Sequence, residues 1–188
     1  VGYFKFELTT GRDRELMKNG LTKHLALGRQ WEVPMLVGEY GIEMERDDAP
    51  EYIRTLYSVF DEMKLSGTIW EASMSDTLWN GRVKNIMYAD GSIRPNAMAV
   101  NRPYPRSAAG TIQEFSFNAD SGVFLLEYLE DGDVEHATEI YLPERVYGED
   151  PCVSISPQNA GWEFDPKQRV IRVYPGKTGA AVQVKVSP

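Results

Sequence analysis

The chain has 188 residues, of which 42% are hydrophobic, with a formal net charge of −8 and a pI of about 4.9. This length and apolar content suit one large or two small globular domains. The acidic charge argues against nucleic acid as a partner, because binding to phosphates by counterion release requires clustered Lys and Arg. No apolar run approaches the roughly 20 residues of a membrane span, and the first ten residues lack the features of a signal peptide, so we expect neither.

The cysteine and histidine residues of the sequence do not favour a metal site or redox chemistry. Cys152 is the single cysteine, which excludes an intramolecular disulfide, and we expect it to be a small core thiol. His24 and His136 are far apart and have no partner motif for a metal site or a catalytic triad. We therefore expect no metal site and no cofactor. The first residue is Val rather than Met, which favours a chain cut from a longer protein or a processing point.

The first half of the chain has helical and parallel-strand patterns in turn. Residues 12–31 predict a helix whose apolar stripe is Leu16, Met17, Leu21, His24, Leu25 and Gly28. The apolar run from Val33 to Gly38 is typical of a strand buried on both faces, as in parallel sheets.

A second helix and a second strand follow this run. Asp48, Pro50 and Glu51 have the spacing of a helix N-terminus. The apolar stripe of this helix is Ile53, Leu56, Phe60 and Met63. Gly67 stands where a helix C-cap is expected, and residues 68–70 predict a short strand. The order helix, strand, helix, strand indicates an α/β fold.

After Tyr104 the helical period gives way to short β-rich runs separated by turn signals. Seven strands are predicted, at residues 111–117, 123–129, 137–142, 153–156, 162–164, 169–174 and 181–186. Their spacing is typical of an antiparallel β-sandwich. The X-Pro steps at Pro95, Pro103 and Pro105 favour extended chain, so we place the domain boundary near Pro103, between residues 1–103 and 104–188.

Two parallel strands do not make a stable sheet, because their edges leave backbone groups unpaired. We therefore expect further strands of the sheet to precede Val1. The alternative is that residues 1–8 add a third strand to a small sheet.

Glu39 and Trp70 each follow a predicted parallel strand, so both are expected at the same edge of the sheet. A carboxylate at the end of a buried strand is desolvated on one side and open to ligand on the other, as a nucleophile or base requires. The alternative is a strand-end glutamate that bonds to backbone amides.

The segment from Trp31 to Gly41, which ends in Gly38-Glu39-Tyr40-Gly41, resembles the seventh-strand motif of family 5 glycoside hydrolases. Residues 68–71 are similar to the end of that family's eighth strand. Residues 101–110, with Arg102-Pro103-Tyr104-Pro105 and Gly110, resemble the junction to the β-sandwich in its endoglycoceramidase-like branch. The resemblance implies the C-terminal part of a (β/α)8 TIM barrel followed by an antiparallel β-sandwich. It also implies that Glu39 is the nucleophile and that Trp70 forms the floor of the sugar subsite.

The sequence departs from the family in one motif. The family's general acid/base is the Glu of an Asn-Glu-Pro motif after the fourth strand, and this sequence contains no Asn-Glu-Pro. Retaining hydrolysis needs two carboxyl groups roughly 5–5.5 Å apart. We therefore expect this chain to be inactive by itself and to require an N-terminal barrel half, on a separate chain or a missing segment.

Further substrate-binding candidates follow the two strand ends: Tyr40, Glu71, Asp76 and Trp79. The alternatives are solvated loop charges for Glu71 and Asp76 and core packing for Trp79. Trp162 is expected in the sandwich core, with an exposed sugar-stacking position as the alternative.

The sequence thus predicts the C-terminal part of a retaining β-glycoside hydrolase acting on a glycolipid, such as a glycosphingolipid, or on a β-linked oligosaccharide. The resemblance also favours a secreted or extracytoplasmic location and allows peripheral membrane contact. One alternative is a noncatalytic β-sandwich that binds carbohydrate or glycolipid through exposed aromatic residues. The other is a structural domain of a surface protein.

Overall fold

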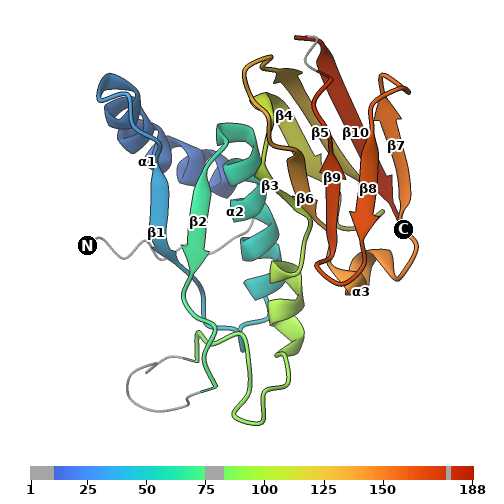
Figure 1. The fold of residues 1–188 in the computed structure, drawn as a ribbon. Coiled ribbons are helices and arrows are strands. Elements are labelled where there is room, and N and C mark those ends of the chain that lie inside the picture. The colour runs from blue at the N-terminus through green and yellow to red at the C-terminus, as the bar shows by residue number, and fades with distance from the viewer. Residues whose placement is uncertain (1–10, 75–82, 177–178) are drawn as a thin grey trace. The chain divides into compact units, whose positions relative to one another are not determined.

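The computed structural model describes residues 11–74, 83–176 and 179–188. Contacts divide the chain into two compact units between Val100 and Asn101. The first unit has helices and parallel strands and the second has antiparallel sheets, as Figure 1 shows, so the predicted fold class is confirmed. The described strands of the first unit do not close a barrel. Within the described ranges, no helix is both long enough and apolar enough to cross a membrane.

The first unit follows the predicted order of helix, strand, helix and strand. Its elements are α1 (Gly11–Gln30), β1 (Leu36–Tyr40), α2 (Ala49–Met63), β2 (Ser66–Ile69) and the 3-10 helix η2 (Pro95–Val100). Strands β1 and β2 pair in parallel, with Leu36 opposite Ser66 and Val37 opposite Gly67 (Figure 1). The region around Pro95, expected to be extended, is η2 instead, because proline suits the first turn of a helix.

Helices α1 and α2 cover one face of the β1–β2 pair. Met17 of α1 packs with Val59 and Phe60 of α2, and Val37 and Tyr40 of β1 lie against this cluster. The other face is open, since Leu36 is 61% exposed and Gly38 and Glu39 are also exposed. The prediction of a strand buried on both faces is therefore wrong for the described residues.

Strand β1 also begins later than predicted, at Leu36 instead of Val33. The backbone N–H of Val33 donates to the carbonyl of Gly28 at 3.0 Å. Val33 thus belongs to the turn that ends α1, and Pro34, which has no N–H, follows it.

The ends of α2 differ from the sequence prediction in detail. Asp48 is the N-cap residue but makes no capping bond with its side chain. It accepts hydrogen bonds from Arg46 Nε at 2.8 Å and Nη2 at 2.6 Å, which hold the pKa of Asp48 below its usual value. The C-cap is Lys64, at φ 55°, and not Gly67. A Cβ on Gly67 would lie 2.8 Å from the Phe60 ring and 2.9 Å from the Tyr40 ring, so this glycine lets β2 pack closely.

The second unit is a sandwich of two four-stranded sheets (Figure 1). One sheet has the order β4-β5-β10-β7 and the other the order β3-β6-β9-β8, with antiparallel pairing in both. The strands are β3 (Tyr104–Ser107), β4 (Gly110–Phe117), β5 (Phe124–Glu130), β6 (Thr138–Tyr141), β7 (Cys152–Ser156), β8 (Trp162–Asp165), β9 (Val170–Val173) and β10 (Ala181–Ser187). The short helix α3 (Glu144–Tyr147) follows β6. All seven predicted strands are present, and β3 is an addition to them.

The sandwich core consists of alternate residues of its strands. Phe124, Leu126 and Tyr128 of β5 are buried, as are Val182, Val184 and Val186 of β10. Two expectations about this core are wrong. Trp162 is 44% exposed on β8, at the edge of its sheet, and Cys152 is exposed on β7.

Candidate active site

The carboxyl ends of β1 and β2 lie side by side. Tyr40 pairs with Ile69, and the backbone N–H of Trp70 donates to the Tyr40 carbonyl at 2.7 Å. The hydroxyl of Thr68 donates to the Gly38 carbonyl, which adds a second bond between β2 and β1, on the N-terminal side of the pair Tyr40 and Ile69. These bonds fix the backbone of Glu39 on the strand next to the one that leads into Trp70.

The register of β1 shifts between Val37 and Tyr40, and Glu39 and Tyr40 differ in their surroundings: Glu39 is exposed, whereas Tyr40 packs against α2. The Tyr40 hydroxyl donates to the Tyr57 hydroxyl at 3.0 Å, and its ring stands edge-on to Phe60 with the centroids 5.2 Å apart. Tyr40 therefore contacts α2 instead of the open face. Burial, and then the neighbouring Tyr40, raise the pKa of Tyr52, so this half-buried phenol stays neutral in the same layer.

The side chain of Glu39 is exposed on the open face. Among the described residues, its carboxylate has no hydrogen-bond or ion-pair partner. The alternative in which Glu39 bonds to backbone amides is thus not what these residues show. A carboxylate that is fixed through its strand and open to solvent is free to contact a ligand.

Trp70 and Glu71 continue from β2 and are joined by a cis peptide bond. Trp70 is half-buried, whereas Glu71 is only 8% exposed. The backbone of Glu71 is held by the carbonyl of Lys84 at 3.4 Å and by the N–H of Ile86 at 2.9 Å. Its Oε1 atom is buried and has no hydrogen-bond partner among the residues that the structure describes. The interpretation of Glu71 as a solvated loop charge is therefore wrong.

The segments that follow β1 and β2 are tied together by a buried arginine that the sequence patterns did not indicate. Arg94 is 4% exposed, its Nη1 lies 3.3 Å from Glu45 Oε1, and its guanidinium carbon lies 4.3 Å above the Tyr88 ring centre. The backbone N–H of Met44 also donates to the Val83 carbonyl at 2.9 Å. Most arginines are exposed, so only the fold reveals that this one links the two segments.

Two other predicted site residues, Asp76 and Trp79, lie outside the described residues. Across the described part of the chain, no group of three His, Cys, Asp or Glu side chains could hold a metal ion. Of the candidate site residues, the structure therefore describes Glu39, Tyr40, Trp70 and Glu71, with Glu39 exposed on the open face and Tyr40 packed against α2.

The second unit matches a known protein family. Residues 102–187 match the glycoside hydrolase family 5 C-terminal domain. No curated protein sequence matches the chain.

Solved structures extend the similarity to the first unit. Endo-glycoceramidase II from Rhodococcus sp. is 26% identical, with a TM-score of 0.72 over 92% of this chain and 36% of that enzyme. Sterylglucosidase 1 from Cryptococcus neoformans is 19% identical, with a TM-score of 0.78 over 93% of this chain and 32% of the other. The second likeness concerns the fold alone. The chain thus spans about a third of the length of each of these proteins.

Proposed function

Because residues 102–187 form a glycoside hydrolase family 5 C-terminal domain, we propose that this chain is the C-terminal part of a retaining β-glycosidase in which Glu39 is the nucleophile. The observation that carries the proposal is the exposed Glu39 carboxylate, fixed on β1 beside the strand that leads into Trp70. The similarity to endo-glycoceramidase II, of which structures of a lactosyl-enzyme intermediate and a ganglioside GM3 complex exist, supports a glycolipid or a β-linked oligosaccharide as substrate.

In the proposed reaction, a Glu39 oxygen attacks the anomeric carbon while the bond to the leaving oxygen breaks. A second carboxyl group protonates that oxygen and then removes a proton from the water that hydrolyses the glycosyl ester. The sequence has no Asn-Glu-Pro motif to supply this second group. General acid catalysis contributes roughly 10²–10⁴-fold, so we propose that the chain alone is inactive.

The second carboxyl group would come from an N-terminal barrel half. Among the described residues β1 and β2 form a two-stranded sheet, so each strand has a free edge. Large apolar side chains are exposed at and before β1: Trp31 at 65%, Val33 at 50% and Leu36 at 61%. Additional strands would pair with the free edges and cover this apolar surface. On this proposal residues 1–103 belong to the barrel and residues 104–188 form its accessory sandwich.

The other candidate residues have roles that follow from their surroundings. Trp70 would stack on the apolar face of the sugar at the cleavage point. Leaving the Glu71 Oε1 atom buried without a donor costs about 1–3 kcal/mol, so we propose that a sugar hydroxyl or a side chain of the barrel half donates to it. Tyr40, bonded to Tyr57, would support the strand that carries Glu39. Asp76 and Trp79 are kept as proposed substrate contacts.

The test uses the full-length enzyme with a β-glycoside substrate and a 2-deoxy-2-fluoro-β-glycosyl fluoride, which traps the glycosyl-enzyme. We expect Glu39→Gln to abolish turnover, and peptide mapping of the unsubstituted enzyme to find the label on Glu39. The matched control is Glu51→Gln, which changes an exposed carboxylate in the first turn of α2 and should leave turnover unchanged. Full activity of Glu39→Gln, or a label on another residue, would remove Glu39 from the mechanism.

A further inference from the structure

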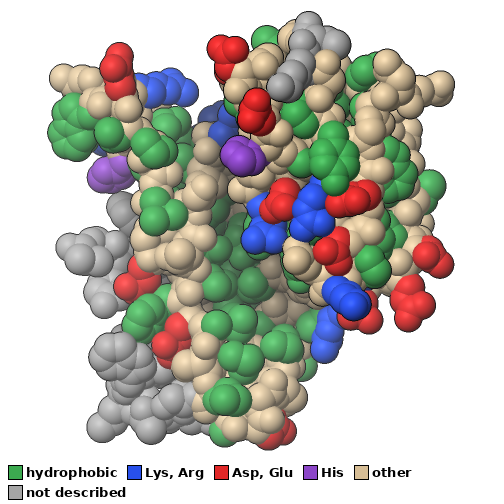
Figure 2. Space-filling model, in the orientation of Figure 1, with side chains coloured by type: hydrophobic (Ala, Val, Ile, Leu, Met, Phe, Trp, Pro, Cys, Tyr) green, Lys and Arg blue, Asp and Glu red, His purple; other side chains and the backbone are tan. Residues whose placement is uncertain are grey.

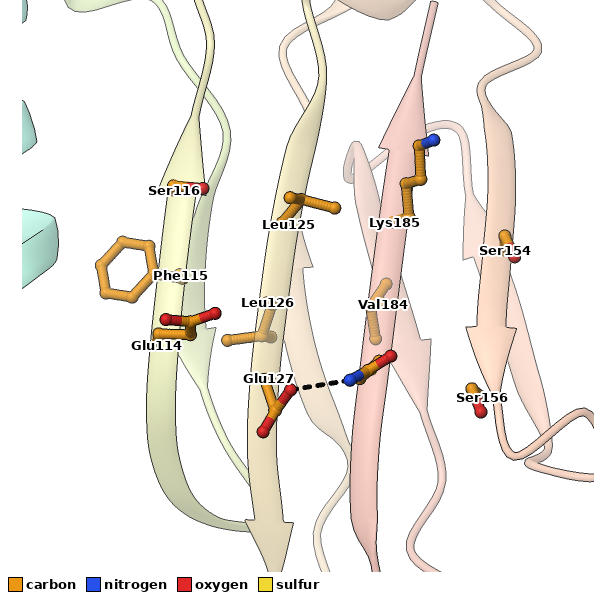
Figure 3. Close-up of a pocket in the computed structure, with 11 residues that line it drawn as sticks. Glu114, Phe115, Ser116, Leu125, Leu126, Glu127, Ser154, Ser156, Val184 and Lys185 are labelled. Atoms are coloured by element: carbon orange, nitrogen blue, oxygen red, sulfur yellow. Dashed lines mark hydrogen bonds between the residues drawn. The ribbon is translucent and has the colours of Figure 1, made fainter.

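The sandwich has a groove of about 390 Å³ on the outer face of its β4-β5-β10-β7 sheet (Figure 3). The register of the strands arranges its outward side chains in two rows across the sheet. One row is Ser116, Leu125, Lys185 and Ser154, and the other is Glu114, Glu127, Gln183 and Ser156. Neighbouring strands are about 4.8 Å apart, so each row extends roughly 14 Å.

Most polar side chains of this groove face solvent and do not bond to other described side chains. Gln183 Nε2 donates to Glu127 Oε2 at 2.7 Å, the contact drawn in Figure 3. Among the described residues, the other polar side chains of the two rows have neither a hydrogen bond nor an ion pair: Glu114, Ser116, Ser154, Ser156 and Lys185. Glu114 and Glu127 also stand directly opposite each other, an arrangement of like charges that destabilises a strand pair.

The outer face of the other sheet is different. Arg172 lies 3.0 Å from Glu139 and 3.5 Å from both Glu163 and Asp165, and it donates to Gln168 at 2.6 Å. Figure 2 shows basic and acidic side chains gathered over this part of the second unit, and these residues belong to β6, β8 and β9. There the polar groups bind one another, whereas those of the groove remain available to a ligand.

The groove's chemistry narrows the class of ligand. Two carboxylates against one ammonium disfavour an anion, and among the described residues no group of three His, Cys, Asp or Glu side chains could hold a metal ion. An apolar partner would remove these polar groups from water without supplying hydrogen bonds, which is unfavourable. A neutral sugar chain instead offers hydroxyls that both donate and accept, and C–H faces for Leu125, which is 47% exposed.

We propose that this groove binds a neutral oligosaccharide. The site lies wholly within the second unit and does not depend on Glu39 or on catalysis. It differs from the aromatic platform considered in the sequence analysis, because hydrogen-bonding side chains and a leucine carry the binding.

The experiment is an amide NMR titration of the 188-residue chain with cellotetraose. We expect saturable shifts in β4, β5, β10 and β7. Gln183→Ala removes one hydrogen-bonding group from the groove and should weaken the affinity roughly three- to tenfold. Gln168→Ala is the matched control, because this glutamine also bonds to a charged side chain but lies in the turn after β8, beside the opposite sheet. Its substitution should leave the affinity unchanged. Dispersed amide spectra will show that both variants are folded.

Three results would overturn the proposal. The first is the absence of saturable shifts in these strands. The second is a set of shifts confined to the region of Glu39 and Trp70, which would support the proposed active site while excluding the groove. The third is a set of equal chemical-shift changes with glucose at four times the concentration, because the shifts would then reflect a nonspecific effect of sugar hydroxyls and not the binding of a chain.

Discussion

The contact between Gly41 and Trp70 gives the most direct test of how the two strand ends are held. An ideal Cβ on Gly41 would lie 2.3 Å from the Trp70 carbonyl oxygen, closer than real Cβ atoms approach a neighbour. Gly41 is not among the glycines with positive φ, so the close approach, and not the backbone conformation, requires glycine. Gly41→Ala must therefore push the ends of β1 and β2 apart.

The cost has two components. Overpacking against a rigid backbone costs about 1–3 kcal/mol. The hydrogen bond from Trp70 N–H to the Tyr40 carbonyl, at 2.7 Å, would be strained or lost, which adds about 0.5–1.5 kcal/mol. We expect Gly41→Ala to lower the free energy of unfolding by roughly 1.5–4.5 kcal/mol.

Urea unfolding followed by tryptophan fluorescence measures this loss, and Gly38→Ala is the control. Gly38 lies on the same strand, and no atom would come within 4 Å of its Cβ. Its substitution should leave the stability unchanged or raise it by about 0.4–1 kcal/mol through the unfolded state. On the proposed function, a displacement of about 1 Å in the full-length protein should lower kcat/KM roughly 10²-fold for Gly41→Ala. Equal stability of the two variants would refute the reasoning.

Three further predictions concern single contacts. A double-mutant cycle of Tyr40→Phe and Tyr57→Phe should give a coupling of about 0.5–1.5 kcal/mol in urea unfolding, because the two hydroxyls are 3.0 Å apart, and a coupling near zero would contradict this. Gly20→Ala, inside α1 with no atom within 4 Å, should raise the free energy of unfolding by about 0.5–1 kcal/mol, and a loss would show a contact that the structure lacks. The backbone amides of Gln168 and Lys167 donate to Asp165 and lower its pKa below the usual 3.8. The ionised Asp165 therefore stabilises the fold above pH 3.8, and this stabilisation is lost as the pH falls through the lowered pKa. The difference in Tm between the chain and Asp165→Asn should accordingly shrink below pH 3.8.

The sandwich could be predicted from the sequence because each of its strands has a local signature. In β10 the period of two that places Val182, Val184 and Val186 in the core is visible in the residue order. Strand β3 was missed because Pro105 cannot donate a backbone hydrogen bond and favoured a linker. β3 is an edge strand, where a residue without an N–H is tolerated.

The first unit could be predicted in order but not in detail. The apolar stripe of α2 is buried as expected at Ile53, Leu56 and Phe60. The stripe of α1 is only partly so, because Met17 is buried but Leu16 is 48% exposed and His24 is also exposed. The position of Gly67 was ambiguous, because a glycine after a helix suits both a C-cap and a tight contact, and only the distances to Phe60 and Tyr40 decide between them. Likewise, burial of Glu71 and Arg94 depends on how the segments after β1 and β2 fold back, which no local pattern encodes.

The described part of the chain determines where Glu39 lies but not how its carboxylate is oriented. Its backbone is fixed by strand pairing and by the bonds of its neighbours to Thr68 and Trp70, while its side chain has no bonding partner there. A nucleophile accelerates a reaction most when it is held in one geometry next to the substrate, and a side chain that is free to rotate loses part of this acceleration. On the proposed function, the groups that orient Glu39 must therefore come from outside the described residues, and we propose the same barrel half that supplies the acid. Adding that half to the chain should then restore both the glycosyl-enzyme step and the proton transfer together.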